Sequence, residues 1–308
     1  MVRILLIVVV GVLGAIALLE VGLRLLFGFG NPLIYRADEK IGYLLAPSQR
    51  TRRMGNRVEI NEYSMRGPAI QATPEAGTLR VMVLGDSIVN GGWWTDQDET
   101  IPAMMASLSQ ERLNGELVEV LNASANSWGP PNQLAYVREF GLFEASAVVL
   151  IINTDDLFAK PPDPSVVGRD RNYPDRKPPL AILEVFDRFA PSQPPPESSP
   201  PVEVPRDPVG YNLDAIRELN AIAVATGARF RLAMTPLRRE IGEPGPKDYE
   251  LKARDRLKSL AETENIEYID FLPIFNAHPQ PETLYRDHIH LSPEGNRLVS
   301  DRLELIDH

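Results

Sequence analysis

One serine and one histidine in this chain have neighbours that suit nucleophilic catalysis. Ser87 ends a Gly-Asp-Ser run that directly follows the apolar segment 81–84. Among the four histidines, only His290 has an aspartate three residues before it, Asp287. A serine hydroxyl is a weak nucleophile that needs a base within hydrogen-bond reach, and a carboxylate on the other ring nitrogen orients that base. These residue types permit acyl transfer through an acyl-enzyme.

Alternating strand and helix patterns indicate how these residues are positioned. Short apolar runs predict five strands, and amphipathic segments between them predict helices. The strands are expected at 81–84, 117–121, 148–152, 230–234 and 266–271. This order predicts an α/β fold, a three-layer α/β/α sandwich around a five-stranded parallel sheet. Because reactive groups gather beyond the carboxyl ends of parallel strands, the loops after the first three strands and the loop before the last helix are expected to meet.

The two motifs resemble those of the SGNH hydrolases, the GDSL esterase–lipase superfamily. The Gly-Asp-Ser after the first strand is similar to the first block of that family, and the run from Asp287 to His290 is similar to its Asp-x-x-His block. The resemblance covers about 79–308, interrupted by a proline-rich insertion at 161–208. It implies a flavodoxin-like SGNH fold, with Ser87 as nucleophile, His290 as base and Asp287 as the residue that orients the base.

The resemblance also implies an oxyanion hole with three donors. These are the backbone N–H of Ser87, a backbone N–H from the second block and an asparagine side chain from the third. Ser127 stands where the second block has glycine, and Gly129 is the alternative. In the third block Asp155 occupies the asparagine position, and an ionised carboxylate cannot donate. Residues two apart on a strand face the same side, so Asn153 is the alternative donor.

Two adjacent tryptophans follow the serine in a glycine-rich loop. Trp93 and Trp94 either wall an acyl or sugar pocket or pack beneath the loop, and both interpretations stay open. The chain has no cysteine, which excludes disulfides and thiol catalysis. The pair His288 and His290 has no further ligand cluster beside it, so we expect neither a metal ion nor an organic cofactor.

A long apolar helix is predicted at the amino terminus. The run from Ile4 to Leu19 is slightly shorter than the roughly 20 residues of a membrane-spanning helix. Glu20 and Arg24 follow one helical turn apart, where they can pair near the membrane edge. A signal peptide cleaved after Ala17 is the alternative, but the apolar pattern continues past that residue and favours an uncleaved anchor.

The charges that flank this helix conflict with its expected orientation. Only Arg3 precedes it, whereas Arg24, Arg36 and Lys40 follow it, and by the positive-inside count alone the domain would stay in the cytoplasm. Large domains translocate largely regardless of charge, and the segment stands where a signal-anchor belongs. We therefore expect an extracytoplasmic domain, periplasmic or at the cell surface.

The predicted organisation has three parts. These are a signal-anchor helix at 1–28, a juxtamembrane linker with a small accessory segment at 29–78, and the SGNH-like domain at 79–308. In the second part we expect a strand at 58–61 and a turn at 66–68. Many membrane-anchored SGNH proteins have a similar Asn…Arg-Gly segment there. The basic cluster of the second part is interpreted as solvated surface, with lipid headgroups or an anionic substrate as alternatives; it comprises Arg50, Arg52, Arg53 and Arg57.

The insertion at 161–208 has repeated Pro-Pro pairs, which rule out continuous helix or sheet. Only 181–189 within it has a helical pattern. It is interpreted as a passive surface loop, with a lid as the alternative.

The chain is thus predicted to be a membrane-anchored serine esterase. Its partners would be the membrane and a carboxylic ester, such as an acetylated cell-envelope glycan or a lipid. The formal net charge of −10 argues against a nucleic-acid partner. Two alternatives remain: an O-acyltransferase that passes the acyl group from Ser87 to a sugar hydroxyl, and a catalytically silent binding protein on the same fold. The residues do not indicate an oligomeric state.

Overall fold

The computed structural model of the chain describes residues 1–112, 117–189 and 203–303. Its centre is a parallel sheet with the strand order β6-β5-β7-β8-β9. Counted along the chain, this is the 2-1-3-4-5 order of flavodoxin-like folds. The predicted fold class is confirmed, and each expected strand overlaps an observed one: β5 (Leu79–Gly85), β6 (Val118–Ser124), β7 (Ala147–Asn153), β8 (Arg229–Thr235) and β9 (Glu267–Asp270).

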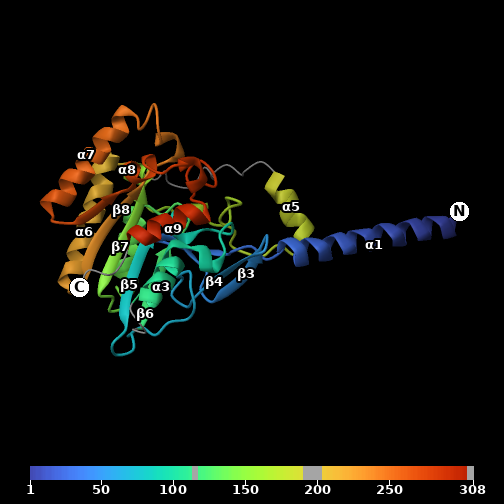
Figure 1. Cartoon of the computed structure of the whole chain (residues 1–308). Coiled ribbons are helices and arrows are strands. Elements are labelled where there is room, and N and C mark those ends of the chain that lie inside the picture. Colours follow the sequence, from blue (N-terminus) through green and yellow to red (C-terminus); the bar gives the residue numbers. More distant parts are fainter. Residues whose placement is uncertain (113–116, 190–202, 304–308) are drawn as a thin grey trace.

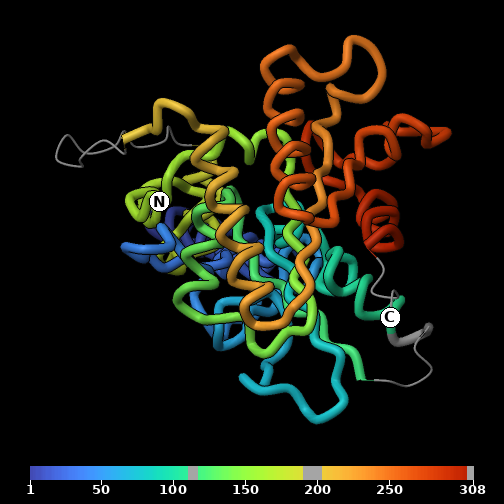
Figure 2. Tube along the Cα trace, turned by 90° about the vertical axis from the view of Figure 1, so that its left-hand side faces the viewer, coloured from blue at the N-terminus to red at the C-terminus, as the bar shows by residue number. Residues whose placement is uncertain are grey.

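Successive residues of the central strands face two different apolar cores. On β5, Val81 and Val83 face one core, whereas Met82 and Leu84 face the other. Figure 2 shows the sheet between α6 on one side and α3 and α9 on the other. The first core is covered by α2 (Ser87–Asn90), α3 (Ile101–Arg112), α8 (Phe271–Asn276) and α9 (Pro293–Arg302), and the second by α4 (Pro130–Phe140), α6 (Pro208–Ala225) and α7 (Asp248–Thr263).

Capping residues start the two helices that lie nearest to Ser87 and His290. The side chain of Asp86 accepts a hydrogen bond from the N–H of Ile88 at 2.8 Å, which starts α2 immediately after β5. At α9 the hydroxyl of Ser292 accepts from the N–H of Gly295 at 3.1 Å, and a proline occupies the first helical position. Both turns therefore lie at defined places on the carboxyl edge of the sheet.

Two antiparallel hairpins precede the sheet. β1 (Tyr35–Asp38) pairs with β2 (Gly42–Leu45), and β3 (Gln49–Arg53) pairs with β4 (Asn56–Ile60). Only the last of these strands was expected, because the others are short and β3 is almost entirely polar, with no clear apolar alternation. Apolar side chains from the hairpins pack into the core under α4.

The basic cluster does not form one solvated surface, which corrects the interpretation of these arginines. Arg50 and Arg57 make ion pairs at the surface. Arg53 is only 3% exposed, and its guanidinium pairs with Glu184 in the insertion and donates to the carbonyl of Gly28 at 3.0 Å. The sequence contained no local sign of this burial, because the partner is 131 residues away.

The amino-terminal helix α1 (Val2–Phe27) projects away from the domain with no buried residue (Figure 1). It is long and apolar enough to cross a membrane. The expected pair forms, because Arg24 Nε lies 2.6 Å from a carboxylate oxygen of Glu20. The insertion contains the predicted helix, α5 (Ala181–Phe189), and its proline-rich stretch at 190–202 lies outside the described residues.

Candidate active site

One chain of hydrogen bonds joins the serine, the histidine and the aspartate. Ser87 Oγ lies 2.9 Å from His290 Nε2, and His290 Nδ1 lies 2.8 Å from Asp287 Oδ2. Ser87 follows the central strand β5, and the loop before α9 returns across the carboxyl edge of the sheet. The topology therefore brings together residues about 200 positions apart, as the sequence analysis expected.

The environment of Asp287 keeps its carboxylate ionised. Burial opposes ionisation, but the backbone N–H groups of Ile289 and His290 donate to Oδ1 at 3.0 and 2.8 Å. Together with the imidazole they lower the pKa of Asp287 to about 2. The charged carboxylate favours a proton on His290 Nδ1, which leaves Nε2 as the acceptor for the hydroxyl of Ser87.

Two residues that line the pocket have backbone N–H groups with no acceptor within the described residues. One is the N–H of Ser87, at the first position of α2, and the other is that of Ser127, in the loop after β6. Ser127 has a φ of +59°, the left-handed conformation that glycine adopts without strain. The serine thus takes the backbone conformation expected of the glycine it replaces, and both residues line the same pocket.

The side chain of Asn153, which was considered as the oxyanion donor of the third block, instead makes hydrogen bonds beneath the pocket. Its side-chain nitrogen donates to Asp86 Oδ2 at 3.0 Å and to Asp156 Oδ2 at 2.9 Å. An amide nitrogen carries two hydrogens, so these bonds use its donor capacity. Asp155 is exposed, and neither Asn153 nor Asp155 lines the pocket. The N–H of Gly129, the alternative in the second block, donates to a side chain in α4 at 3.0 Å.

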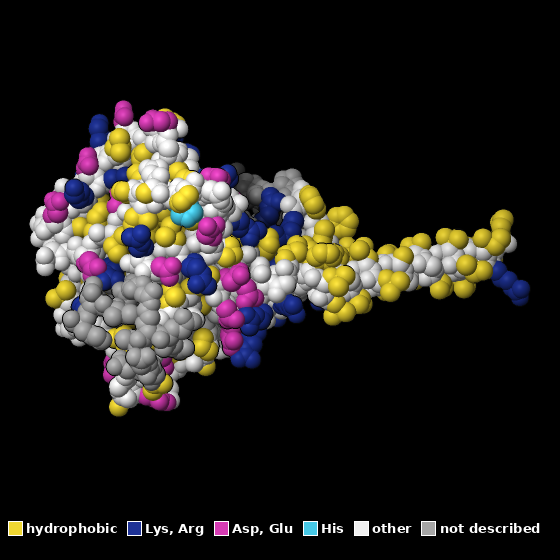
Figure 3. All heavy atoms as spheres, in the orientation of Figure 1, with side chains coloured by type: hydrophobic (Ala, Val, Ile, Leu, Met, Phe, Trp, Pro, Cys, Tyr) yellow, Lys and Arg dark blue, Asp and Glu magenta, His cyan; other side chains and the backbone are white. Residues whose placement is uncertain are grey.

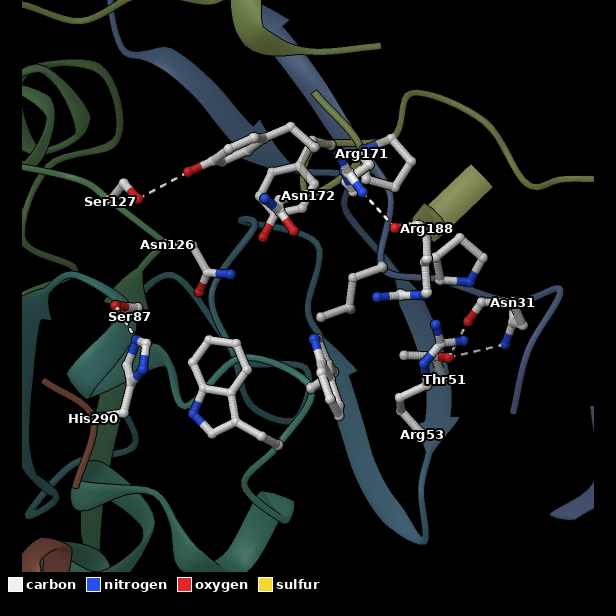
Figure 4. A pocket seen from close by; sticks show the side chains of 17 residues that line it. Asn31, Thr51, Arg53, Ser87, Asn126, Ser127, Arg171, Asn172, Arg188 and His290 are labelled. Atoms are coloured by element: carbon white, nitrogen blue, oxygen red, sulfur yellow. Dashed lines mark hydrogen bonds between the residues drawn. The ribbon is translucent and has the colours of Figure 1, made fainter. Parts of the chain in front are cut away.

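Asn126 lines the pocket beside Ser87, and the sequence analysis did not select it (Figure 4). Its side-chain oxygen is buried and has no hydrogen-bond partner in the described part of the chain. The two ends of an amide exchange when the group is turned over, so this side chain can present its N–H₂ to the same space. In the sequence, Asn126 could have been selected because it directly precedes Ser127 in the loop that carries the second block.

Two buried carboxylates lie beneath Ser87. Burial raises the pKa of Asp86 to about 6, although the N–H of Ile88 opposes the shift. Burial also raises the pKa of Asp156, and the charge of Asp86 raises it further, to well above the usual range. The amide of Asn153 bridges the two carboxyl groups, which makes them a joint support for the turn that carries Ser87.

The pocket beside Ser87 has a volume of about 280 Å³. Trp93 and Trp94 both line it, and the ring centre of Trp94 lies 4.4 Å from that of His290. This position favours the pocket-wall interpretation of the tryptophans. The guanidinium of Arg66 donates to the carbonyls of Gly92 and Thr95, both at 2.6 Å, and so holds the loop in place.

Away from the serine, the pocket extends toward the end of α1. Figure 4 shows Ser87 and His290 at one end, and Arg53 and Arg188 at the other. The lining there includes 31–33, only a few residues after α1. Within the described residues, no group of three or more His, Asp or Glu side chains is arranged to hold a metal ion.

Comparisons with known proteins add the following. No curated protein sequence matches the chain. The acetyl xylan esterase AlAXEase has 16% identity over 73% of this chain and 97% of its own, with a TM-score of 0.49. LAE5, an alpha/beta hydrolase from the metagenome of Lake Arreo, has 15% identity over 72% and 91%, with a TM-score of 0.48. Axe2, an acetylxylan esterase from Geobacillus stearothermophilus, has 15% identity over 75% and 94%, with a TM-score of 0.47.

A family model gives the assignment. The model of the GDSL-like Lipase/Acylhydrolase family matches residues 83–298. The match begins inside β5, just before the serine, and ends inside α9, so it contains every residue of the hydrogen-bonded chain. Because it covers more than half of the sequence, the protein belongs to the GDSL-like lipase/acylhydrolase family and is a hydrolase of ester bonds.

Proposed function

We propose that this hydrolase works through an acyl-enzyme on Ser87. The hydrogen-bonded chain from Ser87 through His290 to Asp287 is the observation that supports the proposal. His290 Nε2 takes the hydroxyl proton as Oγ attacks the ester carbonyl, and it returns the proton to the departing alcohol. Water then attacks the acyl-enzyme with His290 as base, which releases the acid and regenerates the serine.

The charge on the tetrahedral oxygen requires donors that are already in place. We assign this role to the backbone N–H groups of Ser87 and Ser127 and to the side-chain amide of Asn126. The two backbone groups have no other acceptor in the described residues, and the amide lines the same pocket. Asn153, in contrast, supports the turn from below through its bonds to Asp86 and Asp156.

The substrate in this proposal is a carboxylic ester whose acyl or sugar group contacts the tryptophan wall. Indole rings bind both aliphatic chains and sugar faces, so an acetylated cell-envelope glycan and a lipid ester both suit the pocket. An O-acyltransferase would use the same acyl-enzyme, with a sugar hydroxyl in place of water. The two reactions differ in their products: a free acid for the esterase, and an acylated sugar for the transferase.

We also propose that the amino-terminal helix is retained as an anchor and that the domain lies outside the cytoplasm. The last turns of α1 are bound to the domain, since Arg24 donates to the carbonyl of Pro179 at 3.0 Å. Intact-mass measurement of the purified protein tests retention, because cleavage after Ala17 would remove seventeen residues. Alkaline phosphatase fused at the carboxyl terminus tests location, because that reporter is active only outside the cytoplasm.

The test of the enzymatic proposal uses the full chain in detergent. We expect the wild type to hydrolyse short-chain nitrophenyl esters and to react with a fluorophosphonate probe, and Ser87→Ala to lose both properties. Ser107→Ala, at an exposed position of α3, is the matched control and should keep both. Full activity in Ser87→Ala, or a folded wild type that reacts with neither ester nor probe, would contradict the proposal.

A further inference from the structure

Helix α5 exposes large apolar side chains and buries a charged one, unlike an ordinary surface helix. Leu183, Phe186 and Phe189 are 42%, 67% and 84% exposed. The side that faces the protein carries Glu184, whose carboxylate is buried and pairs with Arg53. A helix on the surface of a soluble domain normally turns its apolar residues inward. Large apolar groups on the outside of α5 therefore indicate an apolar environment there.

The start of α5 is attached to α1. The carboxylate of Glu20 accepts hydrogen bonds from the N–H groups of Ala181 and Ile182 at 2.7 and 3.0 Å. N–H groups in the first turn of a helix have no partner within that helix. These two bonds therefore fix the start of α5 beside Glu20 of α1. Figure 1 shows α5 rising from the side of α1 at a steep angle rather than running along it.

The position of Glu20 along α1 coincides with the expected edge of the hydrocarbon layer of a membrane. At 1.5 Å per residue, the 16 apolar residues of 4–19 span about 24 Å, somewhat less than the roughly 30 Å of a bilayer core. Glu20 is the first charged residue after this run, so it lies where headgroups begin. Because α5 starts there and leaves α1 steeply, it is positioned to lie along the membrane surface.

A second segment contacts α1 seven residues further along, about two helical turns beyond Glu20. The N–H of Met54, at the tip of the β3–β4 hairpin, donates to the carbonyl of Phe27 at 3.0 Å, and both side chains are exposed. Arg52 beside them is also exposed. Figure 3 shows hydrophobic side chains continuing from α1 onto the adjoining surface of the domain, with Lys and Arg side chains around the junction. Apolar groups bordered by basic ones are typical of a contact with lipid headgroups and acyl chains.

We infer that α5 is an interfacial helix whose outer face rests in the surface of the lipid bilayer beside α1. Lipid fits better than a protein partner, because the apolar face adjoins a helix that is itself suited to lipid. The same helix supplies Arg188 to the lining of the active-site pocket, and its Glu184 holds Arg53 in that lining. One wall of the pocket would thus be in contact with the membrane. The inference does not depend on catalysis by Ser87.

Site-directed spin labelling of the full chain tests this contact directly. The protein has no cysteine, so Phe186→Cys and Leu183→Cys each provide a single labelling site. The matched control is Val224→Cys, at an apolar residue of α6 that is 62% exposed and lies far from α1. Each variant is reconstituted into vesicles of phosphatidylcholine and phosphatidylglycerol. The accessibility of its label to O₂, which concentrates in lipid, is then compared with that to a water-soluble nickel chelate.

At Phe186 and Leu183 we expect oxygen accessibility to exceed nickel accessibility, and at Val224 we expect the reverse. Preferential access of nickel at both α5 positions in vesicles would overturn the inference. So would labels shielded from both reagents, because protein would then cover this face.

Discussion

The side-chain nitrogen of Asn153 donates to a carboxylate oxygen of Asp86 at 3.0 Å, across 67 positions of the chain. This bond connects the end of β7 to the residue that precedes Ser87. It places Asn153 under the turn that carries Ser87 and not in the pocket. In the proposed mechanism another side chain must then donate to the oxyanion, and we propose Asn126, which lines the pocket with Ser87.

Replacing Asn126 by alanine tests that role. We expect Asn126→Ala to lower kcat by about 10²–10³-fold, the usual effect of removing one oxyanion donor. The melting temperature should hardly change, because the side chain has no bond to lose at its buried oxygen. Steady-state kinetics with a short-chain ester measures the effect.

Asn172→Ala is the matched control, since this asparagine lines the same pocket and we assign it no role in the oxyanion hole. We expect it to alter KM more than kcat. An Asn126→Ala enzyme with kcat within threefold of the wild type would show that the oxyanion is stabilised without this amide.

Asp287→Asn is expected to lower kcat by about 10⁴-fold, because an amide holds the histidine in the wrong tautomer. His288→Asn serves as the control: His288 is in the same loop, but its side chain is largely exposed and its ring nitrogen lies 3.8 Å from Asp287 Oδ1, beyond hydrogen-bond distance. Its kcat should equal that of the wild type. A mild defect in Asp287→Asn would mean that the orientation of His290 does not depend on this carboxylate.

Ser127 is expected to act through its backbone alone. Ser127→Gly should keep kcat, because glycine has the same N–H and adopts the φ of +59° readily. Ser127→Ala should also keep kcat but be less stable than the glycine variant by about 1 kcal/mol, the strain of a side chain in the left-handed region. Urea unfolding and ester kinetics measure the two effects. A large fall in kcat in both variants would assign catalysis to the hydroxyl, which now accepts a bond from Tyr173 at 2.9 Å.

The buried carboxylate pair predicts a pH-dependent stability. Burial first, and then the charge of Asp86, raise the pKa of Asp156 above its unfolded value, so the folded state takes up a proton more readily than the unfolded state. The free energy of unfolding therefore falls as the pH rises from the unfolded pKa of 3.8 through the raised folded value. Asp156→Asn removes this charge and keeps an oxygen for the N–H groups of Asn153.

We expect Asp156→Asn to melt at a higher temperature than the wild type at pH 8, and the difference to shrink as the pH falls toward 4. At this protein size a melting shift of about 2–4 °C corresponds to 1 kcal/mol. Asp155→Asn, which changes the exposed neighbouring aspartate, should show a weaker trend, because the charge of Asp155 is the smallest of the causes that raise the pKa of Asp156. A constant difference between Asp156→Asn and the wild type at all pH values would exclude a raised pKa at Asp156.

Much of the catalytic arrangement was predictable because its signals are local. Apolar runs marked the strands, and the spacing of Asp287 and His290 predicted the pair that the structure shows. A parallel sheet then requires that the loops at its carboxyl edge meet. The sequence by itself thus determined the fold class and the three residues of the hydrogen-bonded chain.

Only the tertiary structure decided where the polar side chains of the site point and which charges are buried. Nothing near Asn153 in the sequence reveals the carboxylate of Asp86, and nothing near Arg53 reveals Glu184. Such polar groups are buried only where hydrogen-bonding or charged partners lie beside them. These partners come from distant parts of the sequence, so the positions of the polar groups depend on tertiary contacts. The position of α5 beside α1 also depends on a tertiary contact, because the first N–H groups of α5 donate to the carboxylate of Glu20.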